Sequence, residues 1–382
     1  MQVISFKILY ISKICSTFAV KLQNEMRMFA MKKGKYAMKC NKYLYCVLAF
    51  CALVMWSCSP QDEPRPSEDK PLIILDTDIG SSADDLFAME MLYDYHRRGL
   101  CTLLGVIVDR AGENCAACAD VMNTWHGFGA LPLGLVRDGL KDPKIWIDYG
   151  QMPYYKNADS TFMFHRSIAD YAALPDGWEL YRKLLSQQKD HSVTICSVGF
   201  LACLAQLLQS EGDAYTPLNG VELVRKKVRA VYLQGGVFGE AEESDFNMTQ
   251  GPEFAHEFFR LFPSDVALVF SPQEVGQMVE YVPERVIEDI NWTDIHPVKQ
   301  VYMTCNCNTG QRMWDVCTVM NAVEEDLFLL SEPGTVELTP ECYTVFTPGE
   351  EGNCRYQKPR DSMWAEQILD AIRAVAQWRP AL

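Results

Sequence analysis

Four aspartates stand close together near residue 80, and their spacing could bind a cation. They are Asp76, Asp78, Asp84 and Asp85. Carboxylates this close repel one another unless a cation lies between them. Hard oxygen ligands suit Ca²⁺ or Mg²⁺ better than Zn²⁺. Because aspartate also begins helices, a helix cap with a solvated loop is the simpler alternative. A cap needs only one aspartate, so the cluster favours a metal site.

These aspartates lie where a predicted strand ends and a predicted helix begins. Residues 72–75 form a short apolar run after Pro71, which is typical of a buried parallel strand. After a Gly-Ser-Ser turn, Leu86, Met89 and Leu92 recur at helical spacing. In an open α/β sheet, ligands bind at the carboxyl ends of the strands. We therefore expect the site at this edge.

The rest of the chain alternates between predicted strands and helices. This pattern predicts an α/β fold with a mostly parallel, Rossmann-like open sheet that has helices on both faces. Residues 137–175 are irregular and are expected to cover the site. Residues 336–359 predict a small antiparallel addition, and a closing helix follows over 361–375. The other predicted strands cover residues 101–110, 131–136, 192–198, 228–233 and 266–270, and the other predicted helices cover 116–128, 178–187, 201–209, 253–262 and 313–325.

The N-terminal region is typical of export rather than of the fold. Residues 38–58 contain lysines, then an apolar run, and end at Cys58, as in a bacterial lipoprotein signal whose cysteine becomes lipidated. We interpret residues 1–37 as an over-long start, 59–70 as a polar linker and 71–382 as one domain. The domain would then lie in the periplasm or on the cell surface of a bacterium, held to the membrane only by its lipid anchor. An uncleaved membrane anchor is the alternative.

Charge and cysteine content limit the partners. A net charge of −15 argues against a nucleic-acid backbone, whereas small neutral or cationic ligands remain open. The sequence is compatible with a homo-oligomer. The pairs Cys115/Cys118 and Cys305/Cys307 could hold zinc or form disulfides. Free cysteine is a common core residue, which is the simpler interpretation.

The block over residues 71–92 resembles the N-terminal signature of the inosine–uridine-preferring nucleoside hydrolase family. That signature is a strand, an Asp-x-Asp motif, a glycine loop and an Asp-Asp pair that opens a helix. The resemblance implies that Asp78 and Asp85 hold Ca²⁺ and that Asp84 is the general base. It also implies that Asp76 orients the calcium ligands without binding the ion itself.

Two later segments resemble the family in the same order. Residues 197–205 match a strand–turn–helix element in which a backbone carbonyl, here that of Val198, completes the calcium shell. Residues 312–326 match a segment with a His-Asp pair, so the resemblance implies that Asp315 binds calcium. Trp314 replaces the histidine, and its indole cannot donate a catalytic proton, although it can stack on a purine or line the pocket. The general acid is then unassigned. His165, in the irregular segment, is one candidate, and the alternative is that this lone histidine is structural or solvated.

The resemblance also implies a set of residues that bind the sugar. Asn114 follows the second predicted strand, and Asp245 and Asn247 occupy positions where the family binds ribose hydroxyls. A carboxylate and an amide together can accept from and donate to a vicinal diol. The alternatives are an asparagine that bonds its own turn and a polar loop before a helix.

The activity that the resemblance implies is calcium-dependent hydrolysis of the N-glycosidic bond of ribonucleosides, which gives ribose and a free base. The substrate would be a nucleoside or a related glycoside. Two alternatives remain. Because the histidine is lost, the protein could be a lipoprotein that binds nucleosides or sugars without catalysis. Because Asp76-x-Asp78 follows a strand, it could instead be a magnesium-dependent phosphatase of the haloacid-dehalogenase type.

Overall fold

A computed structural model describes residues 70–140, 143, 145, 147–239, 243–305 and 310–380. The predicted over-long start, the export signal with Cys58, and almost all of the linker lie outside these residues. Among the described helices, none is both long enough and apolar enough to cross a bilayer.

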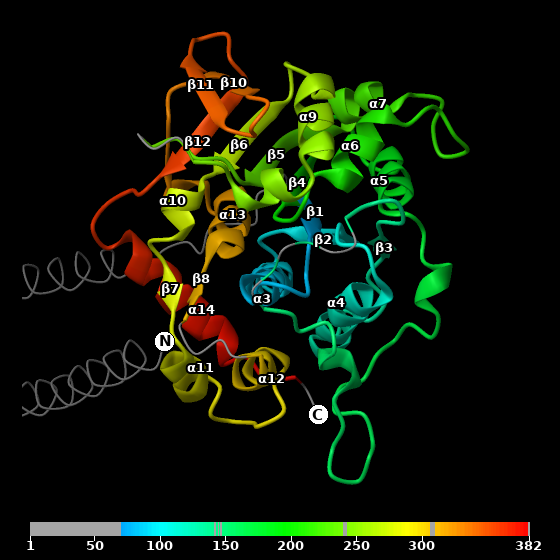
Figure 1. Ribbon diagram of the computed structural model, residues 1–382, viewed down its shortest axis with the longest axis vertical. Coiled ribbons are helices and arrows are strands. Elements are labelled where there is room, and N and C mark those ends of the chain that lie inside the picture. The colour runs from blue at the N-terminus through cyan, green and yellow to red at the C-terminus, as the bar shows by residue number, and fades with distance from the viewer. Residues whose placement is uncertain are drawn as a thin grey trace, which may run out of the picture. The chain divides into compact units, whose positions relative to one another are not determined.

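The centre of the described chain is a sheet with seven parallel strands in the order β3-β2-β1-β4-β5-β6-β12 (Figure 1). The strand order reverses between β1 and β4, so their carboxyl ends form the switch point at which ligands bind in open α/β sheets. The predicted fold class is confirmed. The seven strands are β1 Leu72–Thr77, β2 Thr102–Val108, β3 Leu133–Leu135, β4 Val193–Ser197, β5 Val228–Gln234, β6 Ala267–Ser271 and β12 Cys354–Lys358.

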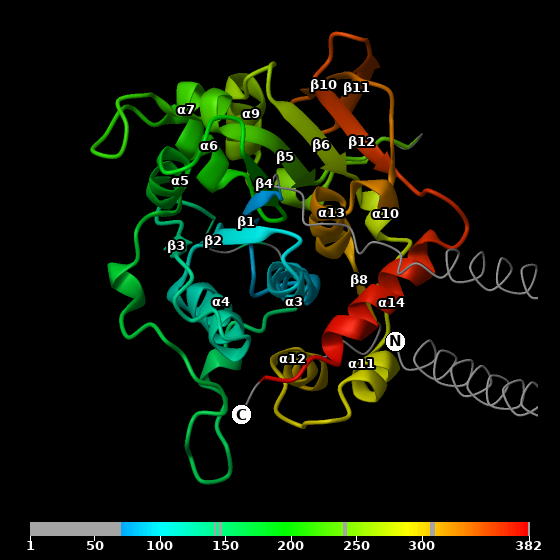
Figure 2. The same ribbon diagram turned by 180° about the vertical axis from the view of Figure 1, so that it is seen from behind.

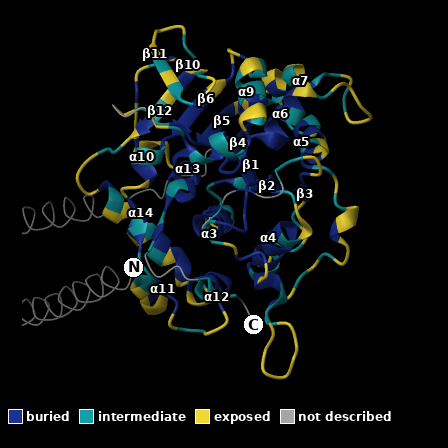
Figure 3. Ribbon diagram, in the orientation of Figure 1, coloured by how far each residue is buried: buried dark blue, intermediate teal, exposed yellow. Residues whose placement is uncertain are grey.

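Helices cover both faces of this sheet, as the apolar strands require (Figure 2). The strands in the middle of the sheet are buried, and they are dark blue in Figure 3. One face packs against α3 Asp84–Arg97, α4 Glu113–Trp125, α13 Trp314–Val323 and α14 Trp364–Ala376. The other face packs against α5 Gly177–Ser186, α6 Ala202–Gln209, α7 Gly220–Lys227 and α9 Pro252–Leu261.

The C-terminal addition differs from its prediction in one respect. β10 (Gly334–Leu338) pairs antiparallel with β11 (Thr344–Pro348), as expected. β12, however, pairs parallel with β6 and therefore extends the main sheet. The short strand β9 (Leu329–Leu330) pairs antiparallel with β12 but lies outside the main strand order. Strand partners depend on distant chain segments, which explains why local sequence did not reveal this junction.

Several short elements between β5 and α13 were not predicted, because each is too brief to show a clear hydrophobic period. Together they carry the chain from β5 past the edge of the sheet that holds the aspartates. They are α8 Phe246–Gln250, α10 Gln273–Gly276, β7 Glu280–Tyr281, α11 Pro283–Asp289, α12 Pro297–Thr304 and β8 Gln311–Arg312. The described 3₁₀ helices are Met152–Tyr154, Tyr171–Ala173 and Glu325–Leu327.

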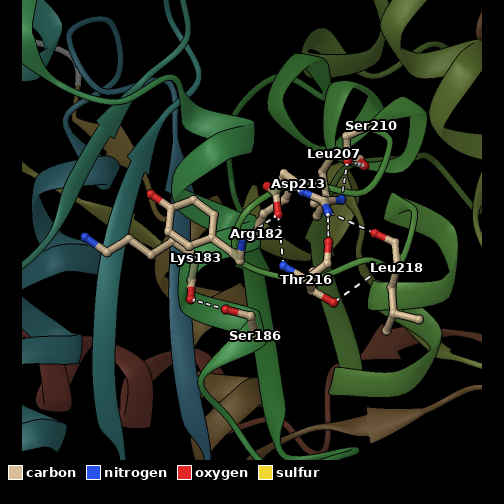
Figure 4. Close-up of polar contacts among 9 residues, drawn as sticks. Arg182, Lys183, Ser186, Leu207, Ser210, Asp213, Thr216 and Leu218 are labelled. Carbon is tan, nitrogen blue, oxygen red and sulfur yellow. Dashed lines mark hydrogen bonds and ion pairs between the residues drawn. The ribbon is translucent and has the colours of Figure 1, made fainter.

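A buried arginine ties α5 to the loop that follows α6 (Figure 4). Arg182 donates from Nε to Asp213 Oδ2 at 2.7 Å and from Nη1 to Ser210 Oγ at 2.8 Å. Its Nη2 donates to the carbonyls of Thr216 and Leu218. The hydrogen bond from Arg182 lowers the pKa of Asp213. This charge is fully paired and has a structural role.

Candidate active site

Strand β1 directs successive side chains to opposite faces of the sheet. Asp76 faces α5, where Tyr181 Oη donates to its Oδ2 at 2.8 Å. Thr77 faces α3, and its hydroxyl donates to Asp85 Oδ1. Asp78 follows the strand, and Gly199 lets the backbone after β4 approach it closely, because a Cβ there would lie 2.4 Å from the Asp78 nitrogen. The end of β1 therefore places Asp78 and the Thr77 hydroxyl that binds Asp85 at one site, and turns Asp76 to the opposite face.

Asp76 belongs to a second buried group behind the sheet. Its carboxylate, that of Asp109 and the Cys203 thiol offer ligand atoms within 4.8 Å of one another. Asp109 accepts from the Cys203 N–H, which ties α6 to the end of β2. Asp76 is the residue that would be the nucleophile of the phosphatase alternative. Because it is fully buried and points toward Tyr181, it cannot attack a phosphoester in the cavity described below.

The first turn of α3 meets the first turn of α13, and the two helices lie side by side in Figures 1 and 2. Asp84, Asp85 and Asp315 each offer an oxygen, and these three oxygens lie within 4.8 Å of one another. The Asp315 N–H also donates to Asp84 Oδ2 at 3.2 Å. The fold therefore brings together carboxylates that are about 230 residues apart in the chain.

Burial raises the pKa of every carboxyl group in this cluster, and repulsion between carboxylates adds to the rise at Asp78, Asp85 and Asp315. Burial raises the pKa of Asp84 to about 6 and, with the charge of Asp84, that of Asp78 to about 7. Burial and the neighbouring carboxylates raise the pKa of Asp85 and Asp315 further. Arg110, itself buried, opposes the rise at Asp78 and Asp85. Arg110 alone cannot balance all the carboxylates of this cluster, so an excess of negative charge remains.

A divalent cation fits this excess. Asp85 Oδ2 is buried and has no hydrogen-bond partner in the described chain, although its other oxygen accepts from Thr77. An orphaned buried carboxylate oxygen is costly unless a cation or proton satisfies it. The Val198 carbonyl lies nearby and accepts one hydrogen bond, so a lone pair remains. All of these groups are oxygen donors, which suit Ca²⁺ or Mg²⁺.

A cavity of about 590 Å³ opens above the carboxylates. Several predicted site residues line it, while Asp76, Asp85 and Asn114 do not. Asn114 is half-buried beside Gly150, and the buried Asp85 lies beneath the lining. His165 is exposed and does not line the cavity, so the structure does not support this candidate for the general acid. The predicted residues that line the cavity are Asp78, Asp84, Val198, Asp245, Asn247, Trp314 and Asp315.

One wall of the cavity presents hydrogen-bond acceptors. Asn247 Nδ2 donates to the Val198 carbonyl at 3.0 Å and to Gln234 Oε1 at 2.6 Å. Both amide hydrogens are thus used, and Asn247 Oδ1 is left to accept. Asp245 accepts from the Asn247 N–H at 2.9 Å. Burial raises the pKa of Asp245 to about 7, although this N–H, that of Met248 and the Gln234 side chain oppose the rise. This wall suits the hydroxyl groups of a sugar.

The cavity also has apolar lining residues. Trp314 lines the cavity, packs over Gly276 and donates from Nε1 to the Gln273 carbonyl at 3.1 Å. Ile145 and Ile147, from the irregular segment after β3, also line the cavity. Among the described lining residues there is no histidine, lysine, cysteine or tyrosine. Trp314 can therefore stack on a flat ring, but none of these three apolar side chains is an ordinary proton donor.

Sequence reasoning missed two glutamines of the site. Gln234, at the end of β5, holds the amide of Asn247, and Gln311, on β8, contacts Asp84. A polar residue at the carboxyl end of a buried strand was an available signal for Gln234. Nothing in the local sequence marks Gln311, because its strand has only two residues.

In the described chain, the pair Cys115/Cys118 belongs to no metal-competent group and forms no disulfide. Cys115 and Cys118 are free and buried on α4, and Cys305 is free and half-buried. Burial raises the pKa of Cys115 to about 12, which suppresses its thiolate. Cys203 is the one cysteine in the metal-competent groups of the described chain. Cys307 lies outside the described residues.

Comparison with known proteins agrees with this geometry. The description of the family whose model matches residues 73–366 is inosine-uridine preferring nucleoside hydrolase. A search of curated proteins finds no match. Similar solved structures include an inosine-uridine preferring nucleoside hydrolase from Bacillus anthracis, with 16% identity, 80% of this chain and 99% of that chain covered, and a TM-score of 0.58.

Two further structures share the fold to a similar degree. A purine-preferring ribonucleoside hydrolase from Gardnerella vaginalis has 15% identity and a TM-score of 0.57, with 80% of this chain and 99% of that chain covered. An inosine-guanosine nucleoside hydrolase has 14% identity and a TM-score of 0.58, with 81% of this chain and 100% of that chain covered. Identities this low show the fold alone. The family match spans most of the chain, and it shows that this protein belongs to the inosine-uridine preferring nucleoside hydrolase family, whose members are N-glycosyl hydrolases.

Proposed function

We propose that this protein is a calcium-dependent ribonucleoside hydrolase that releases ribose and a free base. The observation that carries the proposal is the meeting of Asp84, Asp85 and Asp315 beneath a cavity whose side wall presents Asp245 and Asn247. A metal-binding floor next to a wall of acceptors is the arrangement needed to hold a sugar beside an activated water.

The proposed calcium ligands are Asp78, Asp85, Asp315 and the Val198 carbonyl. The all-oxygen donor set and the unpartnered Asp85 Oδ2 support this assignment. When bound, Ca²⁺ would lower the pKa of a water molecule at the site. The carboxylates also leave the cavity negative, which favours the positive charge that develops on the sugar as the glycosidic bond breaks.

Asp84 is the proposed general base. Its Oδ1 accepts from Ser82 and Gln311 and its Oδ2 from the Asp315 N–H, so the carboxylate is held in one orientation. Burial raises its pKa only to about 6, and it is therefore largely ionised at neutral pH. Asp84 takes a proton from water as the water oxygen attacks the anomeric carbon, and the bonding electron pair leaves on the nitrogen of the base.

Asp245 and Asn247 Oδ1 would accept hydrogen bonds from the sugar hydroxyls, and Trp314 would stack on the base. Asp76 supports the end of β1 through Tyr181, from the opposite face of the sheet. Asn114 does not line the cavity, so we assign it no contact with the sugar. The proton for the departing base has no assigned donor among the described residues.

Reducing-sugar release from a panel of ribonucleosides tests the proposal. The protein should release ribose, and a calcium chelator should abolish the release, with added Ca²⁺ restoring it. Chelation should also lower the melting temperature, because the buried carboxylates then repel one another without compensation. Release that persists in full after the metal has been removed and shown absent by elemental analysis would contradict the proposal.

Because no described histidine, lysine, cysteine or tyrosine lines the cavity, a lipoprotein that binds nucleosides without cleaving them is the second candidate function. Calorimetry separates the two. Riboside binding without release of reducing sugar over hours would favour the binding protein.

We also propose that the protein is a lipoprotein of the bacterial cell envelope, anchored through Cys58. The motif that ends at Cys58 supports this. In a bacterial host, mass spectrometry should find a lipid on Cys58, and Cys58→Ala should move the protein from the membrane fraction to the soluble fraction. Membrane retention of that variant would instead favour an uncleaved anchor.

A further inference from the structure

Arg312 brings a positive charge to a cavity that is otherwise acidic. It lies on β8, and among the lining residues that the structure describes it is the one with a cationic side chain. The carboxylates suit a sugar that becomes positive as its glycosidic bond breaks. They do nothing for the base, which takes up the electron pair of that bond. The other charged residues of the described lining are Asp78, Asp84, Asp245 and Asp315.

Arg312 and Trp314 are held by the same short segment of the chain. Arg312 Nη1 donates to the Gln277 carbonyl at 3.2 Å. Trp314 packs over Gly276, the residue before Gln277 in the sequence. The guanidinium and the indole are therefore anchored at neighbouring residues, and both line the cavity. A base that stacks on Trp314 would lie beside the positive charge.

The guanidinium of Arg312 keeps donors for a ligand. Its Nη1 uses two hydrogens, one on the Gln277 carbonyl and one on Glu280 Oε2 at 2.9 Å. Within the described residues, its Nε and Nη2 have no hydrogen-bond partner, so three N–H groups remain. The side chain is 42% exposed, so these groups are not sealed in the core. They can bind a ring nitrogen or an exocyclic oxygen of a base.

We propose that Arg312 is a catalytic residue that stabilises the departing base as an anion. This inference rests on the proposed function, in that an N-glycosidic bond is cleaved. As the bond breaks, its electron pair passes to the ring nitrogen, and the negative charge spreads over the ring. A guanidinium does not give up a proton, but its N–H groups bind the developing charge. The base then takes its proton from solvent water, so no acid is needed in the cavity.

Arg312→Ala tests this with two leaving groups. For inosine, kcat should fall about 100-fold, as when one donor to a developing negative charge is removed. For 4-nitrophenyl riboside, kcat should fall less than about fivefold, because 4-nitrophenol is a much stronger acid than the base and its anion leaves without help. Free guanidinium ion, at concentrations too low to unfold the protein, should restore part of the activity on inosine. Arg312→Lys keeps the charge without the fork and should retain more activity than Arg312→Ala.

Arg373→Ala is the matched control. The Arg373 side chain is also 42% exposed and pairs with Asp289 at 3.3 Å and with Asp370 at 3.2 Å, but it does not line the cavity. This variant loses an arginine and its ion pairs in the same way, and its kcat for both substrates should be unchanged.

Three results would overturn the inference and leave the proposed function intact. They are a wild-type kcat for inosine in Arg312→Ala, equal losses for the two substrates, and an equal loss in Arg373→Ala. If Arg312→Ala does not fold, Arg312→Gln decides by the same criteria. A wild-type protein that releases ribose from no ribonucleoside would instead overturn the proposed function, and this inference with it.

Discussion

Helix α3 carries two buried groups of titratable side chains that solve the problem of burial in different ways. At its first turn, Asp84 and Asp85 meet Asp315 beneath the cavity. Further along, Glu90 lies between two imidazoles, with His126 Nε2 and His296 Nε2 each 3.4 Å from Glu90 Oε1. The first group contains carboxylates alone and reaches the cavity, whereas the second is closed.

The closed group can become neutral by itself. Burial raises the pKa of Glu90 to about 7 and lowers that of His296 to about 4, while the pKa of His126 falls further. Near neutral pH, both histidines are uncharged and much of Glu90 is protonated. The carboxylates beneath the cavity have no such partners and need a cation. Burial of titratable groups therefore does not mark a functional site; their composition and their access to a cavity do.

The largest expected effect is a loss of activity on substitution in the carboxylate cluster beneath the cavity but not at Glu90. Asp84→Asn removes the base but keeps the shape, so kcat should fall about 10²- to 10⁴-fold, while ribosides still bind. Steady-state kinetics and calorimetry measure the two quantities. Glu90→Gln, on the same helix, should keep the wild-type kcat. Equal losses in both variants would mean that the helix, and not the base, is responsible.

The second effect concerns pH and stability. The folded pKa of Glu90 is about 7, above its ordinary value of 4.5, so its favourable contribution is complete below about pH 4.5 and is lost as the pH rises through 7. The stability of Glu90→Gln relative to wild type should therefore increase on the order of 3 kcal/mol between pH 4.5 and pH 8. Urea unfolding at both pH values measures this. A pH-independent difference would show that Glu90 is ionised in the folded protein throughout.

The smallest expected effect tests whether the carboxylates beneath the cavity need a cation. Asp315→Asn removes one carboxylate, so calcium affinity should fall at least about tenfold. Without metal, the same variant should melt at a higher temperature than the wild type, since less negative charge is buried. Calorimetry and thermal melts with and without a chelator measure both. A variant that melts lower in both conditions would contradict the idea of uncompensated repulsion.

Local patterns in the chain were sufficient for much of the fold. The apolar run of β1, the aspartates after it and the helical spacing of α3 identified one edge of a parallel sheet, which the structure has. The alternation of strands and helices predicted both covered faces. The region over residues 272–312 was not predicted, because its elements are too short to carry a period.

The sequence by itself determined which chemistry is available: clustered carboxylates at a strand end, a tryptophan in place of the family's histidine, and a carboxylate and an amide for a diol. Only the tertiary structure decided which of these groups meet. It turned Asp76 away from the cavity, left Asn114 outside it, and brought Gln311 to Asp84. The physical reason is that side-chain type is a local property, whereas contact depends on strand register and on helix packing between segments far apart in the chain.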